Sequence, residues 1–274
     1  MTLVDSQVLP RLIATDLDGT LLGVAGAVSA RTADALRRSA AAGAAVILVT
    51  GRTQRRLADV YDQLGAEYLS ICANGAVVYD PMESGVLTCR PMSPGVVREV
   101  CGQLRERVPQ VVFAAHVDSG HRMVHEPGWP LRGTAHGRSM LARVEDLFSE
   151  PVVKLQARAP GHEPERFVEL AAEMVSDLTE VTTQGNRGLV ELSDRGVTKA
   201  SALTAIADGM GVAPSEVLAF GDMPNDASML RWAGRSVAVD NAHPLARAAA
   251  KETTLANVDE GVATYLEKLL RCSP

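Results

Sequence analysis

The chain has 274 residues, of which 46% are hydrophobic, enough for one large domain or two modest domains with buried cores. Its formal net charge of -6, with no run of lysines or arginines that could neutralise a phosphate backbone, argues against a nucleic-acid-binding protein. No apolar stretch reaches the roughly 18 residues of a membrane-spanning helix, and the N-terminus lacks the pattern of a signal peptide, so we expect a cytoplasmic protein that does not bind membranes.

The first part of the sequence alternates short apolar runs with Ala-rich segments of helical period. This pattern predicts strands at 11–15, 45–49 and 68–72 and helices at 29–42 and 53–64. A βαβαβ beginning of this kind is typical of a mostly parallel sheet with helices on both faces, in which ligands bind beyond the carboxyl ends of the strands. The dipeptide Asn74-Gly75 that follows predicts a tight hairpin turn.

A segment of different character covers residues 83–193. The pattern predicts helices at 94–107 and 164–175 and strands within 111–125, 151–159 and 177–192. Because these strands pair through turns, we expect them to form an antiparallel sheet.

The first pattern resumes at Thr198. The elements predicted there are helices at 198–210, 225–231, 244–250 and 260–270 and strands at 217–220 and 235–239. We therefore predict an α/β fold with a Rossmann-like core of mostly parallel strands and helices on both faces. The core comprises residues 1–82 and 194–274, and an α+β cap domain is inserted at 83–193.

Polar residues follow the predicted core strands. They are Asp16 and Asp18 after the first strand, Thr50, Gly51 and Arg52 after the second, and Asp222 after the strand at 217–220, with Lys199 at a helix start. Since the carboxyl ends of parallel strands meet at one edge of a sheet, we expect these groups to converge. Gathered carboxylates raise one another's pKa values unless a cation lies among them. Mg²⁺, which prefers hard oxygen ligands, is the natural candidate.

Each of these residues also has a simpler explanation when it is taken alone. Asp-Gly is a common turn dipeptide, and Thr50 or Asn225 could cap the helix that follows it. A lysine at a helix start, such as Lys199, is most often a solvated surface charge. These explanations do not account for the joint occurrence of such residues at successive strand ends.

Four ordered motifs resemble those of the haloacid dehalogenase-like phosphatases: "DLDGTLL", "VTGR", the lysine of "RGVTKASAL", and "GDMPND". The insertion between the second and third motifs, together with "CANGA" and "VDNAHP", resembles the Cof-like subgroup, which carries a large α/β cap. One departure is Met223-Pro224, where many relatives have a glycine. We expect this departure to alter the loop shape without removing the chemistry.

The resemblance implies Mg²⁺ as the cofactor and a role for each acidic residue. Asp16 would attack phosphorus and form an aspartyl-phosphate, and Asp18 would act as general acid and then general base. Asp16 and Asp222 would bind the metal through their carboxylates and Asp18 through its backbone carbonyl, which leaves the Asp18 side chain free for proton transfer.

The other motif residues would bind the phosphoryl group or support the site. Lys199 would offset negative charge, and the Thr50 hydroxyl and the Gly51 amide would donate to phosphoryl oxygens. By the resemblance, Asn225 contacts the same group and Asp226 orients Lys199 or a metal-bound water. The weaker candidates for substrate or cap contacts are Arg52, Asn74 and Asn241.

The inserted segment is expected to select the leaving group. Candidates for a polar sugar or phosphate pocket are His116, His121, Arg122, Trp129, Lys154 and Arg187, although each alone is also consistent with a surface or core position. His121 and His125 have a spacing that could bind a second metal. No carboxylate or cysteine at a suitable interval completes a zinc site there. Cys72, Cys89, Cys101 and Cys272 likewise lack zinc-type spacing and are expected to be reduced thiols.

The function predicted from these residues is Mg²⁺-dependent hydrolysis of a small phosphorylated metabolite, with a sugar phosphate as the best candidate, by a monomer or small homo-oligomer. One alternative is a sugar phosphomutase that reuses the same intermediate. Another is a non-catalytic signalling module, since receiver domains also gather carboxylates, Thr and Lys around Mg²⁺. The position of Asp16 on the first strand and the acid–base candidate Asp18 argue against the signalling module.

Overall fold

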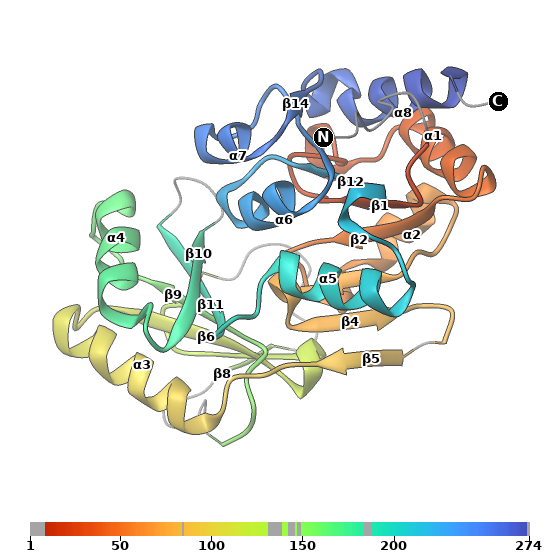
Figure 1. Ribbon diagram of the computed structural model, residues 1–274. Helices are drawn as coiled ribbons and strands as arrows, with labels where there is room; N and C mark the ends of the chain where they lie inside the picture. Colours follow the sequence, from red (N-terminus) through yellow and green to blue (C-terminus); the bar gives the residue numbers. More distant parts are fainter. Residues whose placement is uncertain are drawn as a thin grey trace.

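The computed structural model describes residues 9–83, 85–130, 139–141, 146, 149–183 and 188–272. These residues form two sheets, each with its own helices (Figure 1). The helices are α1 (Ala30–Ala41), α2 (Ala58–Leu64), α3 (Pro94–Arg107), α4 (Pro164–Val175), α5 (Lys199–Gly209), α6 (Ala227–Trp232), α7 (Pro244–Ala249) and α8 (Gly261–Cys272).

The larger sheet combines strands from the early part of the sequence with strands from its late part. Its strand order is β14-β13-β12-β1-β2-β3-β4-β5, and its pairs are parallel except for the two that involve β4. The strands are β1 (Leu12–Thr15), β2 (Ala45–Val49), β3 (Ser70–Cys72), β4 (Val77–Asp80), β5 (Gly85–Cys89), β12 (Val217–Gly221), β13 (Arg235–Ala238) and β14 (Glu252–Thr253). The predicted α/β class with a mostly parallel sheet is confirmed.

The central strands of this sheet are apolar because helices cover both faces. Along β1, Ile13 packs in a cluster with side chains of α1, α2 and α8, whereas Leu12 and Ala14 pack in a cluster with side chains of α5, α6 and α7. The sheet is therefore the middle layer of three.

The register of the central strands aligns the ends that carry the acidic residues. β1 lies between β12 and β2, and Thr15 is opposite both Phe220 and Leu48 in the two parallel pairings. The residues that follow these strands therefore leave the sheet at the same edge.

The second sheet is formed by the inserted segment. Its order is β10-β11-β9-β6-β7-β8, with antiparallel pairs throughout except for β7 and β8. The strands are β6 (Val112–Val117), β7 (Arg122–His125), β8 (Ser139–Leu141), β9 (Lys154–Arg158), β10 (Thr179–Thr183) and β11 (Leu189–Asp194). Apolar residues on one face pack in a cluster with α3 and α4, which lie on the outer side of the sheet (Figure 1).

The chain leaves the first sheet later than the boundary expected after residue 82. β5 pairs with β4 and so extends the first sheet to Cys89. This strand has exposed residues and no clear alternation of apolar and polar side chains, so the pattern gave no signal for it. β8 and the two-residue β14 were also not predicted.

No helix among the described residues has both the length and the apolar character needed to cross a membrane.

Candidate active site

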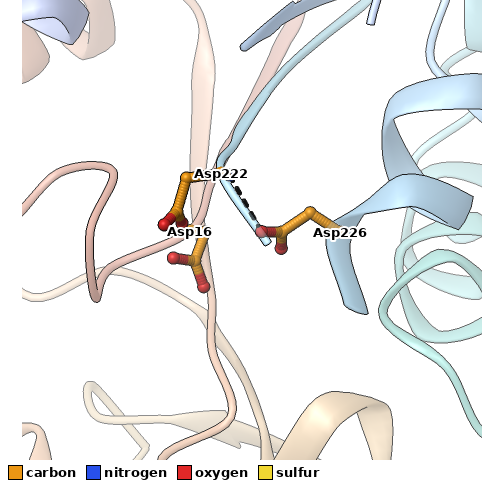
Figure 2. A group of neighbouring side chains, drawn as sticks. All are labelled: Asp16, Asp222 and Asp226. Carbon is orange, nitrogen blue, oxygen red and sulfur yellow. Dashed lines mark hydrogen bonds between the residues drawn. The ribbon is translucent and has the colours of Figure 1, made fainter. Parts of the chain in front are cut away.

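Asp16 and Asp222 lie at the centre of the site, directly after the adjacent strands β1 and β12. The Asp16 amide donates to the Phe220 carbonyl at 3.0 Å, which continues the ladder between the strands. The two carboxylates lie next to each other (Figure 2), and the residues are only 5% and 4% exposed. Two acidic groups are thus held together away from water.

Lys199 and Asp226 complete this buried group. Lys199, the first residue of α5, donates through Nζ to Asp16 Oδ1 and to Asp226 Oδ1, each at 2.5 Å. Asp226 ends the short turn η8 (Pro224–Asp226), and its Oδ2 accepts from the amides of Asp222 and Met223 at 3.0 and 2.9 Å. Both Asp226 oxygens are therefore engaged in holding Lys199 and the loop after β12.

The start of α5 is fixed by local hydrogen bonds. Thr198 caps the helix by accepting from the Ser201 amide at 3.0 Å, and the Ser201 hydroxyl accepts from the Thr198 amide at 2.9 Å. The Asn74-Gly75 turn between β3 and β4 packs against this N-terminal end of α5. A Cβ at Gly75 would lie 2.2 Å from the Thr198 carbonyl oxygen, and Gly75 has a φ of +110°. Only glycine fits this turn against the helix that carries Lys199.

Burial sets the protonation of the acidic pair. Burial raises the pKa of Asp16 well above its ordinary value, although Lys199 opposes the shift. Burial, with the added repulsion of Asp226, raises the pKa of Asp222 to about 6. Burial alone would lower the pKa of Lys199, but the carboxylates of Asp16 and Asp226 more than offset it, so the pKa is raised. Lys199 stays charged, whereas ionisation of the acidic pair needs further positive charge.

A divalent cation fits this group. Asp16, Asp222 and Asp226 each offer an oxygen within 4.8 Å of the others, and they form the one such group of acidic, His or Cys residues in the described parts of the chain. When all three carboxylates are ionised, the single ammonium of Lys199 leaves an excess of negative charge. Oxygen donors and excess negative charge are what Mg²⁺ requires.

The orientation of Asp222 is fixed by the loop after β1. The Thr20 hydroxyl donates to Asp222 Oδ1 at 2.8 Å. The backbone of Gly19 comes so close that a Cβ there would lie 2.3 Å from Asp222 Oδ2. Because both Asp226 oxygens are already engaged, Asp16 and Asp222 would be the side-chain ligands of an ion.

Asp18 does not belong to this buried group. Its half-exposed carboxylate accepts from Arg52 Nε at 2.7 Å and from Arg52 Nη2 at 2.5 Å. Such a bidentate pair holds the carboxylate in one orientation, and Asp18 is not one of the three clustered carboxylates. The structure thus separates the two neighbouring aspartates into different environments.

The loop after β2 lies beside this pair. Thr50 is fully buried, and its Oγ1 accepts from the Arg52 amide at 3.0 Å, which leaves the hydroxyl hydrogen available for donation. The Gly51 carbonyl accepts from Nζ of Lys154, a residue of β9 in the second sheet, at 2.7 Å. The loop is therefore held by a hydrogen bond within itself and by a hydrogen bond from the second sheet.

Asn74 and Asn225 bond to each other. Asn225 Nδ2 donates to Asn74 Oδ1 at 3.0 Å, and Asn74 Nδ2 donates to Glu191 Oε2 of β11 at 3.0 Å. Asn241, in contrast, contacts the core loop. Its Nδ2 donates to the Gly19 carbonyl at 2.8 Å, and its Oδ1 accepts from the Asn257 amide.

The cap residues predicted to line a pocket have different surroundings. His116 is buried; burial, together with Lys154, lowers its pKa to about 3, and its Nδ1 has no hydrogen-bond partner in the part of the chain that the structure describes. Arg122 pairs with Glu150 at 2.5 Å. Trp129 is partly exposed, and Arg187 lies outside the described residues.

The histidine pair with metal-type spacing has no third ligand among the described residues. His125 lies in β7, with its Nδ1 3.1 Å from the Glu126 carbonyl, and His121 precedes that strand. Neither residue belongs to a metal-competent group in the described parts of the chain.

Thr20, Gln54 and Glu191 are site residues that the sequence reasoning missed. Gln54 Nε2 donates to the Ser119 carbonyl of the cap at 2.7 Å. Thr20 lies within the "DLDGTLL" motif and could have been found there. Glu191 lies between two buried apolar residues of β11, Val190 and Leu192. An acidic residue within an apolar strand is the signal in the sequence that could have identified it.

Comparisons with known proteins agree with this geometry. The chain is 29% identical to the phosphatase YwpJ of Bacillus subtilis, across 95% of this chain and 100% of YwpJ. It is 27% identical to the pyridoxal phosphate phosphatase YbhA of Escherichia coli, across 93% and 97% of the two chains. It is 28% identical to the 5-amino-6-(5-phospho-D-ribitylamino)uracil phosphatase YitU of Bacillus subtilis, across 94% and 97%.

Solved structures share the fold. SMU.1108c from Streptococcus mutans UA159 matches with a TM-score of 0.84 at 21% identity, across 96% of this chain and 99% of that one. BT4131, a sugar phosphatase of haloacid dehalogenase subclass IIB, matches with a TM-score of 0.80 at 20% identity, across 94% and 98%.

A family model described as haloacid dehalogenase-like hydrolase matches residues 13–266. Because this match covers nearly the whole chain, including every motif residue of the site, the protein belongs to the haloacid dehalogenase-like hydrolase family.

Proposed function

We propose that this protein is a Mg²⁺-dependent phosphatase that hydrolyses a small phosphorylated metabolite through an aspartyl-phosphate on Asp16. The observation that carries the proposal is the buried meeting of Asp16, Asp222 and Lys199 beyond the ends of β1 and β12. The phosphatases named above, which match over nearly their whole length, support the reaction class.

In the proposed reaction Asp16 is the nucleophile. One of its carboxylate oxygens attacks phosphorus, and the ammonium of Lys199, which is bonded to Asp16, offsets the charge of the phosphoryl oxygens. Bound between Asp16 and Asp222, Mg²⁺ would supply the charge that keeps both carboxylates ionised and would stabilise the transferring phosphoryl group. The Thr50 hydroxyl and the Gly51 amide would donate to the remaining phosphoryl oxygens.

Asp18 would handle the protons. Freed from Arg52 and protonated from solvent, its carboxyl group would give a proton to the leaving alcohol, and the resulting carboxylate would later take a proton from the water that hydrolyses the intermediate. Half-exposure and separation from Asp16 suit this exchange with solvent and leaving group. Asp226 would keep Lys199 in position.

The leaving group would lie between this centre and the second sheet, which we propose acts as a cap. Several of the residues of β6, β9 and β11 that alternate with the buried apolar ones are polar, among them His116, Lys154, Gln156 and Glu191. A polar roof favours a hydroxylated leaving group, and a sugar phosphate is our proposed substrate class. By their names, BT4131 is a sugar phosphatase and YitU is a 5-amino-6-(5-phospho-D-ribitylamino)uracil phosphatase.

The experiment that tests this function is a screen of phosphorylated metabolites with the purified protein and Mg²⁺, run in water labelled with ¹⁸O. We expect released phosphate that contains the label, loss of turnover with a chelator, and loss in Asp16→Asn. An isomerised sugar that retains its phosphate would instead show a mutase. Tight Mg²⁺ binding without turnover of any compound would show a signalling module.

A further inference from the structure

A buried polar network joins the cap to the phosphate-binding loop. In the second sheet, Lys154 Nζ donates to Glu191 Oε1 at 2.5 Å, and Gln156 Nε2 donates to the same oxygen at 2.8 Å. The side chains of Lys154 and Glu191 are only 5% and 1% exposed. Their charges neutralise each other, so the pair brings no net charge to the active site.

Both members of this pair also reach the first sheet. Lys154 Nζ donates to the Gly51 carbonyl, and Glu191 Oε2 accepts from Asn74 Nδ2. The segments that they contact are themselves bonded to each other. The Asn74 amide donates to the Thr50 carbonyl at 3.1 Å, and the Ala73 amide donates to the Arg52 carbonyl at 2.7 Å. One ion pair in the cap therefore holds two adjoining loops of the core.

The chemistry of Glu191 sets the direction of the amide groups below it. An ionised carboxylate can only accept, so it binds the NH₂ end of Asn74. The oxygen of Asn74 then faces Asn225, which must present its own NH₂ end. The cap thus determines how a residue of the fourth motif is turned.

Burial of an ion pair is a poor way to gain stability, because desolvation of two charges offsets most of their attraction. A pair of apolar side chains could hold the two sheets together at least as well. Apolar side chains could not, however, fix a backbone carbonyl and a side-chain amide at hydrogen-bond distance. The pair is therefore better explained by positioning than by stability.

We propose that Lys154 and Glu191 are positioning residues that set the phosphate-binding loop and Asn225 when the cap is closed. Cap closure and assembly of the phosphate site are then a single event. This inference rests on the proposed function for what the loop binds, but the contacts themselves do not depend on it.

The test variant is the double substitution Lys154→Met with Glu191→Gln, which leaves no unpaired buried charge. The matched control is Arg105→Met with Glu126→Gln. Arg105 and Glu126 also form an ion pair of the second sheet and its helices, at 2.6 Å, and contact the Val111 carbonyl and the Phe113 amide, all within residues 90–193.

We expect the test variant to lower kcat on the order of 100-fold, since small displacements of a positioning loop have effects of this size. The loss should be similar for p-nitrophenyl phosphate and for the best sugar phosphate, and inhibition by inorganic phosphate should weaken. The control should keep kcat within about twofold, because its pair touches only the cap. A loss confined to the KM of one substrate would overturn the proposal, since it would mean direct contact with that leaving group.

Hydrogen exchange gives a readout that needs no turnover. In the test variant, the amides of residues 50–57 and 73–77 should exchange faster, whereas those of α3 and α4 should not change. The control should leave the two core segments as they are in the unsubstituted protein. Unchanged exchange in the core segments of the test variant would overturn the proposal even if activity fell. A protein that hydrolyses nothing would overturn the proposed function, while the exchange result would still decide this inference.

Discussion

Asp16 and Asp222 are two acidic residues that the fold keeps side by side and nearly out of reach of water. The same burial that would make them poor anions on their own makes them good ligands for a cation. Lys199 supplies one positive charge at Asp16, and its second contact, to Asp226, prevents it from neutralising the pair fully. The arrangement at this scale is a site whose electrostatics are incomplete without a divalent ion.

The pH dependence of Mg²⁺ binding follows from the raised pKa of Asp222, about 6 against an ordinary 3.8. Without metal, the folded protein retains a proton between these values that the unfolded chain releases, so stability falls as pH rises through this range. Metal binding needs the ionised form. We expect the rise in Tm caused by Mg²⁺ to be full at about pH 7.5 and nearly absent at about pH 5. Thermal denaturation across pH measures it, and an equal shift at both pH values would contradict it.

Lys199 should be as important for stability as for catalysis. Lys199→Met leaves Asp226 as an uncompensated carboxylate with no exposed surface, which should lower the free energy of unfolding by about 3–5 kcal/mol. Adding Asp226→Asn should restore a large part of that loss, because the stranded charge is removed. Urea denaturation of both variants without metal provides the comparison. A single variant as stable as its parent would show that Asp226 is not charged in the fold.

At the scale of elements, the helix α5 is aimed at the site by its first turn. Thr198 caps the helix and Lys199 is its first residue, so cap geometry and lysine position are linked. The Asn74-Gly75 turn, which connects β3 and β4, packs against this first turn of α5. Two distant segments thus meet at one helix start.

Thr198→Ala removes this cap and should lower stability by about 1 kcal/mol. It should also lower kcat, because Lys199 loses its fixed start. Ser29→Ala is the matched control, since Ser29 caps α1 by accepting from the Thr32 amide at 3.1 Å, and α1 carries none of the candidate site residues. Both variants should lose similar stability, but only Thr198→Ala should lose turnover. Equal kcat in the two variants would show that the helix cap at Thr198 has no effect on catalysis.

The sequence predicts elements well where helical period and caps coincide. The ranges 94–107 and 164–175 match α3 and α4 because an apolar stripe follows a Ser93 or Glu163 cap and a proline at the first position. β5 was missed because an exposed strand at a sheet edge has neither period nor a buried run. The expected end of the first core segment at residue 82 was too early for the same reason.

The contacts of the candidate site also divide into those that the sequence predicts and those that it does not. That Asp16 and Asp222 would lie close together could be predicted, since they follow adjacent strands of one parallel sheet. The contacts of Glu191 could not. It lies 117 residues from Asn74, and no local pattern indicates which core residue a cap strand will touch. The ion pair of Asp18 with Arg52 is of the same kind, because it depends on side-chain directions that spacing does not fix.

At the scale of the whole molecule, the chain has separate apolar cores. Phe167 is buried with the cap sheet, and Phe220, two residues before Asp222 in the chain, is buried with the first sheet. The cap sheet touches the first through polar contacts such as those of Lys154, Glu191 and Gln54. The apolar core of the cap can therefore be disturbed without changing the core that underlies the acidic residues.

Phe167→Ala should lower the stability of the cap by about 3–5 kcal/mol through the cavity that it leaves. Because that cavity lies in the cap core, we expect Mg²⁺ affinity to stay unchanged. Phe220→Ala is the contrasting variant, since its strand β12 leads directly into Asp222, and it should weaken Mg²⁺ binding as well. Isothermal titration calorimetry measures both affinities, and a similar loss in the two variants would show that the cap and the ion site are energetically coupled.

The close approach of Gly19 to Asp222 bears on how new specificities could be bred in the laboratory. With 2.3 Å between a Cβ and the carboxylate oxygen, no other residue fits there without moving Asp222. We expect a combinatorial library that randomises this position to contain mostly inactive variants. Diversity is better introduced at the roof positions near His116 and Gln156, where a changed side chain can alter the accepted leaving group while the catalyst below stays intact.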